Sequence, residues 1–222
     1  MDSLATTQTL TSPDVVIVKE DFFTINEIEN LWHECRLSGT PKPFIDQWGV
    51  FKGQLVADQL FFDPNQLPYY INRTIAQAQT IFGCPTKIVE VVYQQLHLPW
   101  DIHCDLECNA NDRPYYNLLI PFHNVESRTV VFNQRADEHD AFWKYKQANK
   151  KLQTPVDQET WDRLLSMCWD EDREYLSINQ ILPIQKVGQL VAFDRHHFHC
   201  SDSFHLWNAG TKHFLQVLLD KA

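Results

Sequence analysis

Between residues 24 and 83, apolar residues recur mostly at helical spacing. After residue 83 they occur mainly in short β-rich runs. Residues 15–23 are rich in β-branched and aromatic side chains, which predicts a strand. Thr24 and Glu27 follow at the spacing of a capping box, in which each side chain accepts a hydrogen bond from the other residue's backbone. Apolar residues at helical intervals continue as far as Trp32, so we expect a helix directly after the strand.

A second helix is predicted ahead of the strand-rich region. Residues 48–60 contain short strand candidates, and residues 67–82 have helical spacing that ends at Gly83. Glycine is favoured just past a helix because it readily adopts the left-handed conformation that closes the last turn. Residues 1–13 are polar and lack a periodic pattern, so we expect a loose N-terminal tail.

Most of the later segments with a regular pattern are predicted to be strands. They share a high content of β-branched and aromatic residues and are bounded by turn-forming residues. They cover residues 87–96, 115–122, 128–132, 178–184, 189–193 and 212–220. Residues 136–150 and 157–169 instead have helical spacing, with aromatic residues among charges. We interpret the region of about 135–176 as a helical insertion.

The order of these elements, helices first and strands afterwards, indicates a mainly β (α+β) fold. A double-stranded β-helix, or jelly roll, with the N-terminal helices packed on one outer face accounts for it. The 222 residues contain no internal repeat, low-complexity tract or Gly/Ser linker. We therefore expect a single domain over residues 14–222.

Charge and composition limit the partners and the compartment. The formal net charge is -10 at pH 7, which opposes binding to the phosphate backbone of a nucleic acid. No apolar run approaches the roughly 20 residues needed to cross a bilayer, so no membrane partner is expected. The polar N-terminus lacks the features of a secretory signal, and the six cysteines then indicate reduced thiols. A cytoplasmic location is the expectation.

A candidate metal site centres on His103 and Asp105, in the segment IHCDLE. Residues two apart on a strand point to the same face, so both side chains could bind one ion while Cys104 points away. A His-x-Asp pair is common by chance. The hypothesis therefore depends on a third ligand from elsewhere in the chain.

The third ligand is expected in the His-rich segment 195–205. His196, His197 and His199 all compete, and we favour His199 because it follows a short turn after the strand that ends near Phe193. His196 is the alternative. An early and a late strand of a jelly roll can face each other across its interior. Two histidines and one carboxylate on one face of an ion are typical of non-haem iron(II) oxygenases.

Five segments together resemble the 2-oxoglutarate- and iron(II)-dependent oxygenases, particularly their prolyl-hydroxylase-like branch. They are VVYQQLHLPWDIHCD, YYNLLIPF, RTVVFNQ, GQLVAFDRHHFHCSD and GTKHFLQVLLD. The resemblance implies a dioxygenase that hydroxylates a small molecule or a peptide residue. Its cofactors would be iron(II), dioxygen and the cosubstrate 2-oxoglutarate, which is released as succinate and carbon dioxide.

The resemblance also implies which residues hold the cosubstrate. Lys212 matches the basic residue that binds the far carboxylate of 2-oxoglutarate, and a buried carboxylate without a partner would be costly. Tyr93 matches a tyrosine whose hydroxyl bonds the same carboxylate. Thr211 is expected to assist.

The chain departs from the family pattern at QQLHLPW, where many relatives have glycines, and in its long insertion, which we expect to form a lid. The substrate therefore does not follow from the resemblance. Three other interpretations stay open. They are a jelly-roll binding protein without turnover, a cupin-like metalloenzyme that does not use 2-oxoglutarate, and a structural zinc site of His103, Cys104, Cys108 and Cys200.

Overall fold

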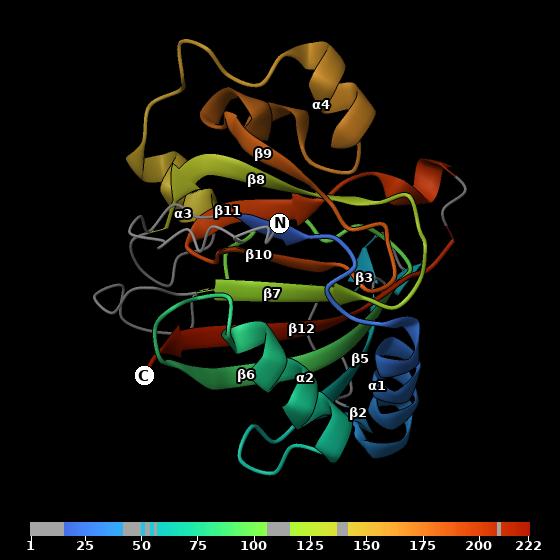
Figure 1. Ribbon diagram of the computed structural model, residues 1–222. Coiled ribbons are helices and arrows are strands. Elements are labelled where there is room, and N and C mark those ends of the chain that lie inside the picture. Colours follow the sequence, from blue (N-terminus) through green and yellow to red (C-terminus); the bar gives the residue numbers. More distant parts are fainter. Residues whose placement is uncertain are drawn as a thin grey trace, which may run out of the picture.

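Two antiparallel sheets face each other and form a jelly roll (Figure 1). The larger sheet has seven strands in the order β1-β10-β7-β12-β6-β5-β2, and the smaller has three in the order β11-β8-β9. The computed structural model describes residues 16–41, 50–51, 54–55, 57–105, 116–136, 142–207 and 210–222. The predicted double-sheet fold is confirmed, while the predicted tail over residues 1–13 lies outside the described residues.

The strands agree closely with the β-rich segments of the sequence. The larger sheet comprises β1 (Ile17–Lys19), β2 (Thr40–Pro41), β5 (Ala57–Phe62), β6 (Thr86–Leu96), β7 (Tyr116–Pro121), β10 (Leu190–Asp194) and β12 (Lys212–Lys221). The smaller sheet comprises β8 (Arg128–Arg135), β9 (Ile178–Pro183) and β11 (His197–Ser201). A separate hairpin pairs β3 (Val50–Phe51) with β4 (Gln54–Leu55).

Strand β11 is the clearest departure from the predicted strands, and the two-residue strand β2 also lies outside the predicted segments. Its residues fall in the His-rich segment that the sequence places between two strands. The strand has no apolar inner face, because its inward side chains are polar, whereas Phe198 and Cys200 are buried on its outer side. A search for β-rich, apolar segments therefore misses it.

The two N-terminal helices cover the outer face of the larger sheet. Helix α1 (Ile25–Ser38) begins with the predicted capping box: the Glu27 N–H donates to Thr24 Oγ1 at 3.3 Å, and the Thr24 N–H donates to Glu27 Oε2 at 2.9 Å. Helix α2 (Tyr69–Gln79) lies beside it and has Thr80 as its C-cap, so it ends before Gly83, the predicted closing residue, which adopts a φ of 64° farther along the chain. Both helices bury apolar residues against the sheet.

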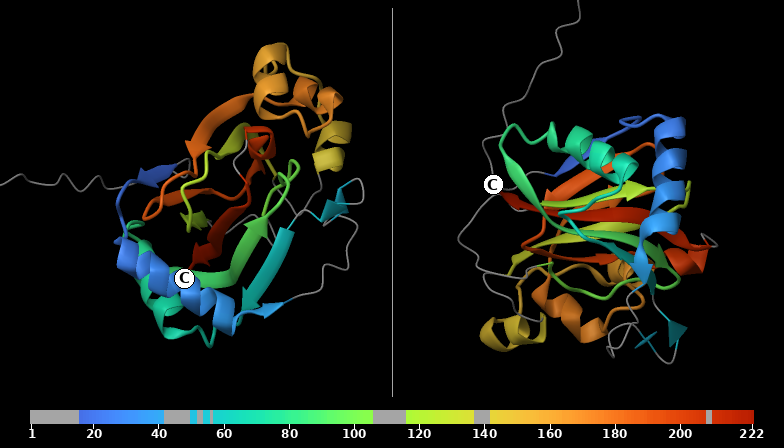
Figure 2. Two further views of the ribbon diagram at one scale, coloured as in Figure 1. Left: turned by 90° about the vertical axis from the view of Figure 1, so that its right-hand side faces the viewer. Right: turned by 90° about the horizontal axis from the view of Figure 1, so that it is seen from below.

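The predicted insertion lies on the opposite side of the molecule and packs on the smaller sheet (Figure 2). It contains α3 (Phe142–Ala148), α4 (Gln158–Leu164) and the 3-10 helix η2 (Asp170–Tyr175), and a further 3-10 helix, η3 (Phe204–Trp207), follows β11. Trp161 of α4 is almost fully buried against Phe132 of β8 and Phe198 of β11. The insertion is therefore an integral layer of the fold.

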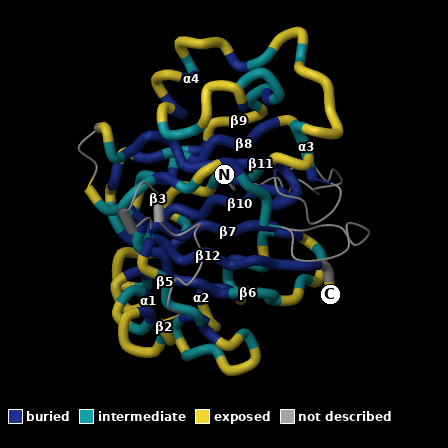
Figure 3. Tube along the Cα trace, turned by 180° about the vertical axis from the view of Figure 1, so that it is seen from behind, coloured by how far each residue is buried: buried dark blue, intermediate teal, exposed yellow. Residues whose placement is uncertain are grey.

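Side chains alternate between the interior and the outer layers along each central strand. On β12, Lys212, Phe214 and Gln216 face the space between the sheets, whereas Leu215 and Val217 pack under the helices. This alternation is the ordinary period of a strand. Figure 3 shows the result, with buried strands at the centre and exposed residues concentrated on the helices and the insertion.

Two further observations concern the chain as a whole. The described cysteines are free thiols; they are Cys35, Cys84, Cys104, Cys168 and Cys200. Within the described ranges, no helix has both the length and the apolar character needed to span a bilayer.

Replacing Thr24 by alanine should lower the free energy of unfolding by about 1 kcal/mol, because the first turn of α1 loses its side-chain cap. Urea denaturation followed by circular dichroism measures the change. Thr24→Ser keeps the hydroxyl and should stay close to the wild type. Equal stabilities of the alanine and serine variants would show that the capping box does not stabilise α1.

Candidate metal centre

The three predicted metal ligands, His103, Asp105 and His199, lie together at the opening between the two sheets. One potential ligand atom from each lies within 4.8 Å of the others. His199 Nε2 is 3.1 Å from Asp105 Oδ2, and His103 Nε2 is 3.7 Å from Asp105 Oδ1. No other described His, Cys, Asp and Glu side chains form a comparable group of three. A single ion could contact all three residues.

Backbone pairing brings these residues together across 96 positions of sequence, from His103 to His199. The His103 N–H donates to the His199 carbonyl at 3.0 Å, and the His199 N–H donates back at 2.8 Å. The segment around His103 thus pairs with the edge of β11 through an isolated antiparallel bridge. Directly opposed residues of such a pair have their side chains on the same face. Both imidazoles therefore point to one side.

His103 and Asp105 were expected to face the same side because they lie two residues apart on one strand, and this explanation is wrong for Asp105. Asp105 does not lie on a regular strand with His103, since only His103 belongs to a bridge. Asp105 is held instead by its own N–H, which donates to the Arg195 carbonyl at 3.3 Å. The neighbouring turn, rather than a strand period, therefore directs the carboxylate toward the histidines.

Hydrogen bonds fix the orientation and tautomer of both imidazoles. His103 Nδ1 lies 2.6 Å from the Asp101 carbonyl, and His199 Nδ1 lies 2.9 Å from the His197 carbonyl. A carbonyl can only accept, so each Nδ1 carries a proton, and each Nε2 faces the site as the atom that could bind a metal. Partners of this kind are typical of metal-binding histidines.

Asp105 is oriented by amides that the sequence analysis did not identify. Asn117 Nδ2 donates to Asp105 Oδ2 at 2.5 Å, and Gln216 Nε2 lies 3.5 Å from the same oxygen. Gln216 in turn accepts from Gln94, which accepts from Trp100 Nε1 at 2.9 Å. One feature of the sequence could have identified these amides: Asn117, Gln94 and Gln216 are polar residues within otherwise apolar, buried strands.

The protonation states suit metal binding. Burial raises the pKa of Asp105, but the charges of His199 and His103 and the hydrogen bonds to the carboxylate outweigh it and lower the pKa to about 2. Burial, followed by the charge of His199, lowers the pKa of His103. An ionised carboxylate and a histidine with a lowered pKa favour metal binding, because a metal ligand must give up its proton.

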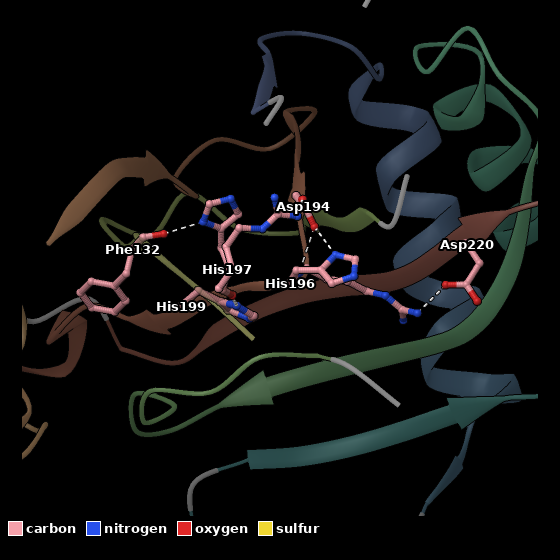
Figure 4. A network of polar contacts seen from close by, with 8 residues as sticks. Phe132, Asp194, His196, His197, His199 and Asp220 are labelled. Carbon is pink, nitrogen blue, oxygen red and sulfur yellow. Dashed lines mark hydrogen bonds and ion pairs between the residues drawn. The ribbon is translucent and has the colours of Figure 1, made fainter. Parts of the chain in front are cut away.

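The structure separates the three histidines that compete as the third ligand (Figure 4). His196 Nδ1 lies 2.6 Å from Asp194 Oδ1, and His197 Nδ1 lies 2.6 Å from the Phe132 carbonyl. Neither histidine belongs to the group of potential ligand atoms that contains Asp105, so the structure does not bring the alternative ligand His196 into it. His199 is the histidine that the fold brings to the other two residues.

A cavity of about 980 Å³ extends inward from this cluster and outward to the insertion. Lys212 lies on its wall with only 2% of its surface exposed. Burial lowers the pKa of Lys212 to about 8, and the carboxylate of Asp202 offsets part of that effect. No described acid forms an ion pair with its ammonium group. A buried ammonium without a paired anion is costly, so this position favours an anionic ligand.

Two of the predicted cosubstrate residues are not brought to the cavity. The Tyr93 hydroxyl lies 2.7 Å from His213 Nδ1, and its ring packs under the helices. The alternation of β6 that directs Gln94 inward turns Tyr93 outward. In this arrangement the Tyr93 side chain does not line the cavity. Thr211 is half-buried and lies outside the cavity wall.

The zinc alternative gains no support from the described residues. Cys104 and Cys200 both pack against the apolar cluster under the insertion, and His103 is turned toward Asp105. The remaining proposed ligand, Cys108, lies outside the described residues.

No protein-family model matches the sequence, and no curated protein matches it. Solved structures do share its fold. The non-heme alpha ketoglutarate dependent carbocyclase SnoK from nogalamycin biosynthesis is 11% identical with a TM-score of 0.61, over 95% of this chain and 81% of that chain. The prolyl-4-hydroxylase of Pseudomonas putida is 11% identical with a TM-score of 0.52, over 94% of each chain.

HygX from Streptomyces hygroscopicus, solved with nickel and 2-oxoglutarate bound, is 10% identical with a TM-score of 0.56, over 95% of this chain and 84% of that chain. At this level of identity, the similarity establishes the fold. The chain has the jelly-roll fold found in 2-oxoglutarate/Fe(II) oxygenases.

His199→Ala should weaken binding of nickel(II) by more than about a hundredfold, because a direct ligand is lost rather than a residue that only orients one. Isothermal titration calorimetry measures the affinity, and circular dichroism verifies folding. His197→Ala is the matched control, because this histidine on the same strand points elsewhere. Equal losses in both variants, or unchanged affinity in His199→Ala, would exclude His199 as a ligand.

Proposed function

We propose that this protein is an iron(II)- and 2-oxoglutarate-dependent dioxygenase that hydroxylates a small molecule or a peptide residue and releases succinate and carbon dioxide. The observation that carries the proposal is one cavity that holds both the His103, Asp105 and His199 cluster and the buried cation of Lys212. The cluster suits the metal, and the Lys212 ammonium suits a carboxylate of the cosubstrate.

The His103, Asp105 and His199 cluster suits iron(II), both in the types of ligand atom and in leaving coordination positions free. Two imidazoles and one carboxylate would hold the ion, and the remaining coordination positions would face the cavity. When bound, iron with 2-oxoglutarate and dioxygen supplies the oxidising chemistry that amino-acid side chains lack. The protein's share is to orient the ligands through Asn117 and the backbone carbonyls of Asp101 and His197.

The spacing of inward residues on β12 suits a short dicarboxylate. Gln216 contacts Asp105 at the metal end, and Lys212 lies four residues earlier on the same face. Four residues of a strand span about 13 Å. A five-carbon dicarboxylate together with the extended lysine side chain bridges that length. Lys212 would therefore bind the carboxylate that lies away from the metal, and Phe214 would pack beside it.

Two hydroxyl groups that line the same cavity would assist Lys212. Thr129 of β8 and Ser201 of β11 are directly paired across the smaller sheet, and both line the cavity. Hydroxyl donors of this kind satisfy carboxylate oxygens that a single ammonium leaves free. They replace Tyr93 and Thr211 in the proposed binding site.

Anaerobic addition of iron(II) and 2-oxoglutarate should produce a weak visible charge-transfer band, and admitting oxygen should then produce succinate. Asp105→Ala should abolish both signals, because the carboxylate ligand is lost. Asp162→Asn, an exposed change on α4, should leave both unchanged. A band without succinate would indicate a binding protein without turnover. Metal binding without any response to 2-oxoglutarate would indicate an enzyme that does not use it.

The affinity for 2-oxoglutarate should fall as the pH rises through about 8, the pKa of Lys212 in the free protein. The pKa is lowered by burial, so the ammonium loses its proton there and no longer attracts the carboxylate. Titrating the visible band at pH 7 and pH 9 measures this change.

Lys212→Arg is the control for this prediction. A guanidinium stays charged over the whole range, so its pH dependence should be flatter. An identical pH dependence in both proteins would exclude Lys212 as the group responsible.

A further inference from the structure

We propose that the outer part of the cavity, next to the insertion, binds a small organic cation: an amine-bearing molecule with an apolar body. The inference deepens the proposed function, on which it rests, by assigning the chemical class of the substrate. It follows from the charges, the aromatic side chains and the size of the cavity.

The inner part of the cavity is electrically balanced once it is filled. The two positive charges of iron(II) and the one of Lys212 would offset Asp105 and the dianion of 2-oxoglutarate. The substrate therefore meets the charges of the outer wall, which on the insertion side come from Asp101, Glu171, Asp172 and one base, Lys146.

Lys146 neutralises only one of these acids. Its ammonium contacts Asp172 closely, whereas Glu171 Oε1 is 3.8 Å away and the Glu171 side chain is 78% exposed. Asp101 accepts a hydrogen bond from the Ile102 N–H at 2.7 Å and forms no ion pair with a described residue. Asp101 and Glu171 thus leave this side of the cavity with an excess of negative charge.

Aromatic side chains frame the same acids. Trp100 precedes Asp101, Trp169 lies two residues before Glu171, and Trp143 projects from α3, and all three line the cavity. Trp143 is 49% exposed and Trp169 is 62% exposed. Large apolar groups left in contact with solvent beside a cavity mark a binding surface. Tryptophan faces also attract cations more strongly than other aromatic rings.

The position of Trp100 connects this outer part to the chemistry. Its ring centroid is 6.2 Å from that of His103, and its Nε1 donates into the amide network that ends at Asp105. A molecule stacked on Trp100 would therefore lie next to the metal ligands. The cavity of about 980 Å³ is within the size range of small-molecule sites, which favours a small molecule over a folded partner.

The test compares two probes with the same phenylbutyl skeleton, 4-phenylbutylamine and 4-phenylbutanol, by isothermal titration calorimetry. The wild type should bind the amine about tenfold more tightly, the magnitude expected for one partly desolvated cation beside aromatic rings and a carboxylate. The double variant Asp101→Asn and Glu171→Gln should remove most of this preference. Trp143→Ala should weaken the binding of both probes.

Glu159→Gln is the matched control, since it removes an exposed negative charge from the same insertion but outside the cavity. It should leave the preference unchanged. Equal affinity of the wild type for both probes, no binding of either, or an equal effect of the control and the double variant would overturn the proposal.

Measuring both the metal-free protein and its nickel(II) and 2-oxoglutarate complex separates this proposal from the proposed function. An amine preference in the metal-free protein supports the cation site even if succinate is never produced. Succinate production with no amine preference would overturn the cation site alone.

Discussion

The site depends on one backbone interaction, the antiparallel bridge between His103 and His199. It attaches a segment outside the named strands to the edge of β11 and places two imidazoles on one face, as expected for directly opposed residues. The hydrogen bond from the Asp105 N–H to the Arg195 carbonyl then completes the proposed ligand set. Because backbone hydrogen bonds position the three proposed ligands, their side chains need only point toward one another. A shift of the pairing by one residue would turn His199 away from Asp105.

A polar interior between two sheets is costly, and the fold compensates for it in two ways. The amides of Asn117, Gln94 and Gln216 bond to one another or to Asp105, so few of their polar groups lack partners. Apolar clusters lie under the N-terminal helices and under the insertion, outside the site. Lys212 remains a buried cation without a paired anion among the described residues. A buried charge without a partner is unfavourable for folding, and such exceptions are expected at functional sites.

The insertion has two sides, one that packs on the smaller sheet and one that lines the cavity. Its inner side is anchored by Trp161 in the cluster shared with β8 and β11, so it is held firmly against the smaller sheet. Its other side contributes exposed tryptophans and acids to the cavity that contains the proposed metal ligands. In the proposed function, the jelly roll would supply the oxidation, while the insertion, one of two places where the chain departs from the family pattern, would select what is oxidised.

The sequence by itself determined the elements whose causes are local: the capping box of α1, most of the β-rich strands and the helical insertion between β8 and β9. It also supplied the candidates His103, Asp105 and His199, and the family resemblance added Lys212. Only the tertiary structure decided which candidates meet. It placed β11, whose polar inner face hides it from a search for apolar strands, and it turned Tyr93 toward the helices. It also revealed the amides around Asp105. Local patterns report the conformation of a segment, but the side that each residue turns to the interior and the distances across that interior depend on the pairing of strands far apart in the chain.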